Sequence, residues 1–85
     1  MKYVETTLDK LKKGQEGIVL KINIKERKKK MHLLDMGLTK GTKVKIKKIA
    51  PMGDPVSIFL RGYELCISKE ELKQIVVGVE SKWNV

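Results

Sequence analysis

Glycines and prolines spaced along residues 33–62 constrain the fold more than any other feature of the chain. The segment LLDMGLTKGTKVKIKKIAPMGDPVSIFLRG contains four glycines and two prolines. Glycine adopts positive φ at no steric cost and proline fixes φ near −65°, so these residues mark the points where the backbone turns. The short apolar segments between them therefore predict strands joined by tight turns.

A helical period covers residues 27–36, directly before the first of these glycines. Its apolar residues are spaced for one helical face: Met31, Leu33, Leu34 and Leu38. Gly37 is well placed as the left-handed residue that ends the helix, so that Leu38 folds back onto Leu33 in a Schellman motif. Asp35 opposes the helix dipole, and we expect its carboxylate to accept hydrogen bonds from backbone N–H groups of the following turn.

Period-two alternation predicts the strands. The predicted strands cover residues 17–25, 43–50, 56–61, 64–67 and 75–79. On the first, the inward residues are expected to be Ile18, Leu20, Ile22 and Ile24. A phase slip at Lys47 and Lys48 predicts a β-bulge, which helps a small sheet to curl. The fold class is therefore mainly β: about five antiparallel strands in a small barrel, with one α-helix inserted after the first strand and a short late helical turn.

Turn chemistry predicts the connections. Pro51 suits the second position of a type I turn, with Gly53 at positive φ. Gly62 followed by Tyr63 fits a two-residue type II′ hairpin. Ser68 with Glu71 is a capping box that opens the late helical turn.

The two chain ends complete this outline. Thr7 is expected to cap a short turn that buries Leu8 and Leu11. Residues 81–85 are expected to form a tail.

Charge is unevenly distributed along the 85 residues, which are enough for one domain with one small core. Residues 1–48 hold 15 basic and 5 acidic side chains, a net charge of +10, whereas residues 49–85 hold 4 and 5, a net charge of −1. Such a positive region attracts nucleic acid, anionic lipid or an acidic protein surface, or serves solubility alone.

Cysteine usage and hydropathy bear on the compartment. Cys66 is the sole cysteine, which excludes an intrachain disulfide, and we expect it to be a small buried hydrophobe in a reducing cytosol. The chain shows no signal-peptide pattern and no segment long enough to span a membrane. These features predict a soluble, cytoplasmic protein.

Catalytic motifs are absent from the sequence, so we do not expect an enzyme. His32 is the single histidine, which leaves no Ser–His–Asp set and no histidine cluster for a metal. Ferrous iron also accepts carboxylates, and five are available: Asp35, Asp54, Glu64, Glu70 and Glu71. None of them joins His32 at ligand spacing, so the metal ligands are unknown, and weak transition-metal binding stays open beside no binding.

The order of these pieces resembles the FeoA family, small cytoplasmic proteins of bacterial ferrous-iron uptake that work with the membrane transporter FeoB. The matching pieces are Leu34-Asp35-Met36-Gly37-Leu38, Gly41, Ala50-Pro51, Gly53-Asp54-Pro55 and Arg61-Gly62-Tyr63. The similarity runs from about Thr7 to Val77, nearly the whole chain. It implies a single SH3-like barrel domain over residues 1–85, as in the C-terminal domain of some metal-dependent repressors.

The resemblance implies a non-enzymatic accessory protein that binds the cytoplasmic part of FeoB and modulates its activity. It would be held at the inner face of the membrane through that partner. Loops on a small rigid barrel are natural recognition surfaces. We expect partner contacts from two turns: Met36, Gly37 and Leu38, and Met52, Gly53, Asp54 and Pro55. The alternative for these residues is that they only shape the barrel.

A nucleic-acid-binding barrel of ribosomal type is the alternative function. It would use the lysines at 43, 45, 47 and 48, together with residues 27–30, on phosphates. Only four aromatic residues occur in the chain, and none interleaves these lysines in sequence as a stacking platform requires.

Overall fold

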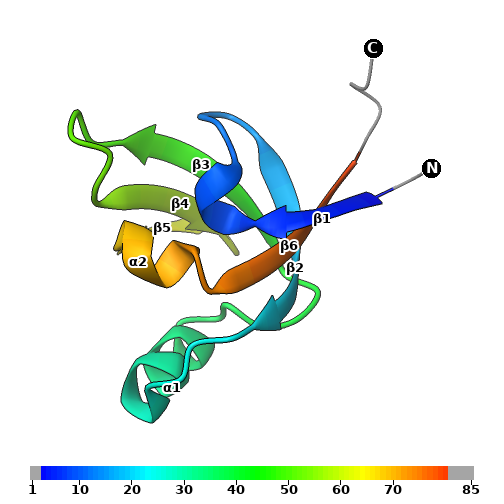
Figure 1. Ribbon diagram of the computed structural model, residues 1–85, viewed down its shortest axis with the longest axis vertical. Coiled ribbons are helices and arrows are strands. Elements are labelled where there is room, and N and C mark those ends of the chain that lie inside the picture. Colours follow the sequence, from blue (N-terminus) through cyan, green and yellow to red (C-terminus); the bar gives the residue numbers. More distant parts are fainter. Residues whose placement is uncertain (1–2, 81–85) are drawn as a thin grey trace.

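One curled antiparallel sheet of six strands dominates residues 3–80, the part of the chain that this computed structural model describes (Figure 1). The strands are β1 (Tyr3–Thr7), β2 (Glu16–Ile22), β3 (Lys43–Ile49), β4 (Val56–Leu60), β5 (Tyr63–Ile67) and β6 (Ile75–Glu80). Their order across the sheet is β1-β6-β2-β3-β4-β5, so the first and last strands in sequence are neighbours. The predicted mainly β architecture is confirmed, with one strand more than expected. The predicted tail at residues 81–85 lies outside the described residues.

Three helical segments accompany the sheet. They are the 3₁₀ turn η1 (Leu8–Lys10), the helix α1 (Arg27–Asp35) and the short helix α2 (Lys69–Leu72). The inserted helix and the late helical turn are thus both confirmed. Figure 1 shows α1 projecting from one end of the sheet, whereas α2 lies against η1.

The strand that sequence patterns missed is β1. It pairs with β6 from Tyr3 opposite Glu80 to Thr7 opposite Val76. None of its residues is buried, because β1 is an edge strand that packs on little else. A strand exposed on both faces carries no period-two signal, which explains the omission.

The predicted inward face of β2 is wrong in its first half. Gly17 and Val19 are buried, whereas Ile18 and Leu20 are half-buried. The pairing of β2 with β6 shifts register between Val19 and Lys21, so a bulge changes the phase of the strand. One continuous alternation cannot describe a strand that contains a bulge.

The predicted bulge in β3 is confirmed, because its pairing with β4 shifts register between Ile46 and Lys48. With the bulge in β2, it curls the sheet around one core. Every helix and strand except β1 contributes to the core, and so do three connections between them. The buried apolar residues are Leu8, Leu11, Val19, Ile24, Leu33, Leu38, Val44, Ile46, Val56, Ile58, Leu60, Ile67, Leu72, Ile75 and Val77.

The predicted helix ends are largely confirmed. Gly37 has φ +97°, and the N–H of Leu38 donates to the carbonyl of Leu33 at 3.0 Å, the long bond of a Schellman motif. Ser68 and Glu71 form the complete capping box of α2. Thr7 precedes η1, but its hydroxyl donates to the Asp9 carboxylate rather than capping the backbone.

The prediction for the β4–β5 hairpin is wrong both in the position of the turn and in its type. The β4–β5 hairpin turns through Arg61 and Gly62, not through Gly62 and Tyr63, because Leu60 pairs with Tyr63. Both turn residues have positive φ, +46° and +89°, which is a type I′ turn rather than type II′.

Two side chains also differ from expectation. Cys66 is exposed, because residues 63, 65 and 67 take the inner face of β5 and Cys66 takes the outer one. Asp35 is exposed, and two N–H groups of the following turn have other acceptors. Thr39 donates to the carbonyl of Gly37 and Gly41 donates to that of Val19.

Candidate partner-binding surfaces

The first predicted contact region, Met36 to Leu38, belongs to a longer connection, residues 36–42, here called the helix corner. It follows α1 and turns the chain into β3. Met36 and Gly37 are half-buried, but Leu38 has no exposed surface. Leu38 therefore supports the helix corner from the core, and the accessible part of the predicted motif is Met36 and Gly37.

Arg61 fastens this corner to the β4–β5 turn. Its Nε donates to the carbonyl oxygen of Gly37 at 3.0 Å. Its Nη2 donates to Oγ1 of Thr42 at 3.1 Å and to Oγ1 of Thr39 at 3.3 Å. The Thr42 hydroxyl, in a side chain only 5% exposed, also donates to the Gly37 carbonyl. This network joins residues 19 to 24 positions apart in the sequence, so Arg61 is a structural residue of the site.

Space explains why glycine occupies position 37. A Cβ there would lie 2.9 Å from Cδ of Arg61, closer than carbon atoms pack. The positive φ adds a second reason, since a Cβ disfavours that conformation. The helix corner thus requires both glycine and arginine.

The second predicted contact region, Met52 to Pro55, lies in the β3–β4 turn, residues 50–55. The N–H of Gly53 donates to the carbonyl of Ala50 at 2.7 Å, which places Pro51 at the predicted second position. Gly53 has φ +88°, also as predicted, and the Asp54–Pro55 peptide is cis. Met52 is 92% exposed at the tip of this turn.

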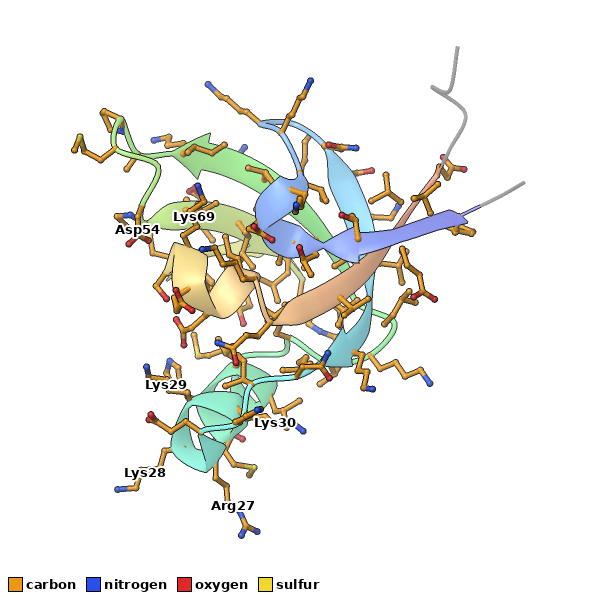
Figure 2. The ribbon with its side chains drawn as sticks, viewed as in Figure 1. Arg27, Lys28, Lys29, Lys30, Asp54 and Lys69 are labelled. Atoms are coloured by element: carbon orange, nitrogen blue, oxygen red, sulfur yellow. The ribbon has the colours of Figure 1, made fainter. Side chains whose placement is uncertain are left out.

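Asp54 connects the β3–β4 turn to α2. Its Oδ1 accepts a hydrogen bond of 2.7 Å from the backbone N–H of Lys69, the first residue of α2 (Figure 2). A carboxylate at a helix start satisfies a free N–H and matches the helix dipole. The turn is therefore held by the Gly53–Ala50 bond and by the Asp54–Lys69 bond, and Met52 lies on a turn of fixed conformation.

The structure does not bring the two predicted regions together. The β3–β4 turn directly precedes β4, whereas Arg61, which holds the helix corner, directly follows it. Five strand residues at about 3.3 Å each place them roughly 15 Å apart along β4. They are two separate surfaces rather than one patch.

Two kinds of feature are absent from residues 3–80, a cluster of metal ligands and a membrane-spanning helix. Within residues 3–80, no three of the histidine, cysteine, aspartate and glutamate side chains are placed to hold one metal ion. The five candidate carboxylates therefore form no such group in this range. In the same range, no helix is long and apolar enough to cross a membrane.

One feature missed from sequence concerns the lysines of β3. Nζ of Lys47 lies 5.7 Å from the centre of the Phe59 ring, a cation–π distance. Phe59 is on β4 and is partly exposed. The two residues are twelve positions apart, so only the pairing of β3 with β4 shows that an aromatic ring does lie among the lysines.

Comparison with known proteins identifies the fold. Residues 6–79 match the family profile of the FeoA domain. This chain belongs to the FeoA family. No curated protein sequence matches it significantly.

Solved FeoA structures superpose on nearly the whole chain. A FeoA-like protein from Clostridium acetobutylicum is 37% identical, with TM-score 0.78 over 93% of this chain and 88% of that one. FeoA from Chlorobium tepidum is 31% identical, with TM-score 0.83 over 87% and 70%. FeoA from Stenotrophomonas maltophilia, described as an SH3 domain protein complexed with zinc, shares the fold at 21% identity and TM-score 0.71, over 85% of this chain and 88% of that one. The predicted SH3-like barrel is thus confirmed.

The fold also occurs within a longer protein of another kind. A manganese-dependent transcriptional repressor matches 94% of this FeoA chain and 44% of its own, with TM-score 0.81 and 11% identity. At that identity the likeness concerns the fold alone.

Proposed function

We propose that this protein is a non-catalytic accessory component of bacterial ferrous-iron transport, which binds the cytoplasmic part of a FeoB-type transporter and modulates its activity. The observation that carries the proposal is the FeoA match over residues 6–79, which includes all six strands except the first three residues of β1 and the last residue of β6. The absence of a metal cluster within residues 3–80 is compatible with a binding role.

The β3–β4 turn is the better of the two contact surfaces. Met52 offers an apolar side chain that is almost fully exposed, on a turn fixed by Gly53 and by the Asp54–Lys69 bond. A pre-ordered turn loses little conformational entropy when a partner binds it. The helix corner offers less, because Leu38 is inside and Arg61 already occupies the Gly37 carbonyl.

A charge placed on Met52 tests this surface. Met52→Asp should change the free energy of unfolding by no more than about 0.5 kcal/mol, because the side chain contacts solvent. It should weaken capture by the purified cytoplasmic domain of the transporter roughly tenfold or more, as for an anchor residue. Pull-down measures binding, and circular dichroism verifies folding.

Met31→Asp is the matched control, since Met31 is an exposed methionine on α1 and outside both turns. It should leave capture unchanged. Gly53→Val, which forces a β-branched residue to φ +88°, should instead unfold the turn. If Met52→Asp stays folded and is captured as well as the unmodified protein, the turn is structural and the contact lies elsewhere.

Weak transition-metal binding is a minor part of the proposal. The described carboxylates supply no cluster, so an ion bound here would keep most of its ligands as water.

Nucleic-acid binding remains the second candidate function, and the Lys47–Phe59 pair is the specific observation in its favour. A single ring gives one stacking position, which suits weak binding without sequence preference.

A further inference from the structure

The first turn of α1 carries a dense group of cations. Arg27, Lys28, Lys29 and Lys30 are consecutive and exposed, and Lys25 just before them is exposed as well. We call these five residues the basic helix tip. Figure 2 shows the four helical side chains extending from α1 in different directions.

Helix stability does not account for this arrangement. Cations at the start of a helix oppose its dipole and repel one another. The first turn of α1 contains no acidic residue, and its N-cap residue Glu26 makes no side-chain cap. Of the α1 residues, all of them described, Leu33 alone is buried. The basic helix tip therefore destabilises α1, a helix that gains little from packing. Residues that lower stability without a structural benefit are typical of a binding surface.

The shape of the tip selects the kind of partner. Consecutive helical residues are about 100° apart, so four cations encircle the axis instead of lining one side. Figure 1 shows α1 standing out from the sheet at one end of the longest axis of the molecule. A convex end that is encircled by cations approaches a flat surface without obstruction.

A hollow beside the tip extends the positive surface. It has a volume of about 400 Å³, and its lining includes Lys21, Lys30 and Lys40 as well as Ile22, Ile24 and Leu34. Cationic and apolar groups together suit an amphipathic anion. Met31, which directly follows the last cation of the tip, is 50% exposed.

We propose that the basic helix tip binds the surface of a membrane rich in anionic phospholipid. The hollow at Lys30 would take a phosphate headgroup, and Met31 would enter the interface. A cluster of four to eight cations is the size that anionic leaflets attract, and the contact is weak and reversible. Single-stranded nucleic acid fits less well, because the tip contains no aromatic residue for bases to stack upon. This binding is independent of the transporter contact.

Sedimentation with lipid vesicles tests the proposal. The full chain should bind vesicles of about 30 mol % phosphatidylglycerol in phosphatidylcholine, and not pure phosphatidylcholine, at about 0.1 M salt. Each cation near an anionic leaflet changes partitioning about fivefold, so Lys28→Gln with Lys29→Gln should lower it roughly 25-fold. Both side chains are exposed, and circular dichroism verifies that the variant remains folded.

Lys12→Gln with Lys13→Gln is the matched control. These lysines are also adjacent and exposed, and they lie between η1 and β2, at the opposite end of the molecule from α1 in Figure 1. The control variant should bind like the unmodified chain.

Three results would overturn the proposal. They are equal losses in both variants, binding to pure phosphatidylcholine, and no binding to either vesicle. Tighter binding to a short DNA duplex at the same salt, lost with Lys28 and Lys29, would assign the tip to nucleic acid instead. None of these results depends on the transporter, so they leave the proposed function unaffected.

Discussion

Gly37 and Arg61 depend on each other although 24 positions separate them. Gly37 ends α1 at positive φ, and without a Cβ it leaves room for the Arg61 side chain to reach its carbonyl. Arg61 in turn holds a positive φ that is uncommon for a residue with a side chain. The hydrogen bonds to Gly37 and Thr42 help to stabilise that conformation.

A comparison of Gly37→Ala with Gly41→Ala separates the cost of positive φ from the cost of displacing the Arg61 side chain. Gly41 has φ +91°, but no atom lies within 4 Å of its missing Cβ. Gly41→Ala should therefore cost about 1 kcal/mol of unfolding free energy, from φ alone. Gly37→Ala should cost about 1 kcal/mol more, since Arg61 must give up its hydrogen bonds. Urea denaturation measures both, and equal losses would show that Arg61 adjusts freely.

At the scale of elements, the sequence predicted those features whose conformation depends on neighbouring residues. The Schellman end of α1, the capping box of α2, the bulge in β3 and the turn at Pro51 each depend on residues within a few positions. The type I′ turn at Arg61 does not, because contacts with a distant helix corner help to stabilise its conformation. β1 escaped prediction because its pairing with β6 leaves no buried face.

The candidate site was predictable to the same extent. The exposed Met52 and the rigid turn beneath it follow from proline and glycine chemistry. The bond from Lys69 to Asp54 does not, because it joins residues 15 positions apart through the packing of α2. The separation of the two surfaces by β4 likewise emerges only from the assembled sheet.

Asp54 and α2 provide the experiment at this scale. Asp54→Ala removes the acceptor of the Lys69 N–H and should cost about 1 kcal/mol, as the loss of a helix cap does. Asp54→Asn retains a side-chain oxygen and should cost clearly less. Urea denaturation with both variants is the measurement. An Asn variant as unstable as the Ala variant would attribute the effect to charge rather than to the hydrogen bond.

At the scale of the whole molecule, the charge of residues 1–48 predicts attraction to any polyanion. We expect binding to DNA or RNA to be weak, without sequence preference, and lost near physiological ionic strength. A protein with six or more phosphate contacts loses affinity steeply with salt, so a titration at several salt concentrations measures the number of contacts. Sequence-selective binding below about 1 μM at about 0.15 M salt would favour the nucleic-acid function.

The pairing of β1 with β6 has a consequence for how this fold is joined to others. Tyr3 lies opposite Glu80, so the chain enters and leaves the described domain at one place, at the opposite end from α1 (Figure 1). A domain with adjacent ends can be placed inside or after another polypeptide without disturbing either core. Such an arrangement leaves the loops and the projecting helix unobstructed. It suits a module that, in the manganese-dependent repressor, accounts for less than half of a larger chain.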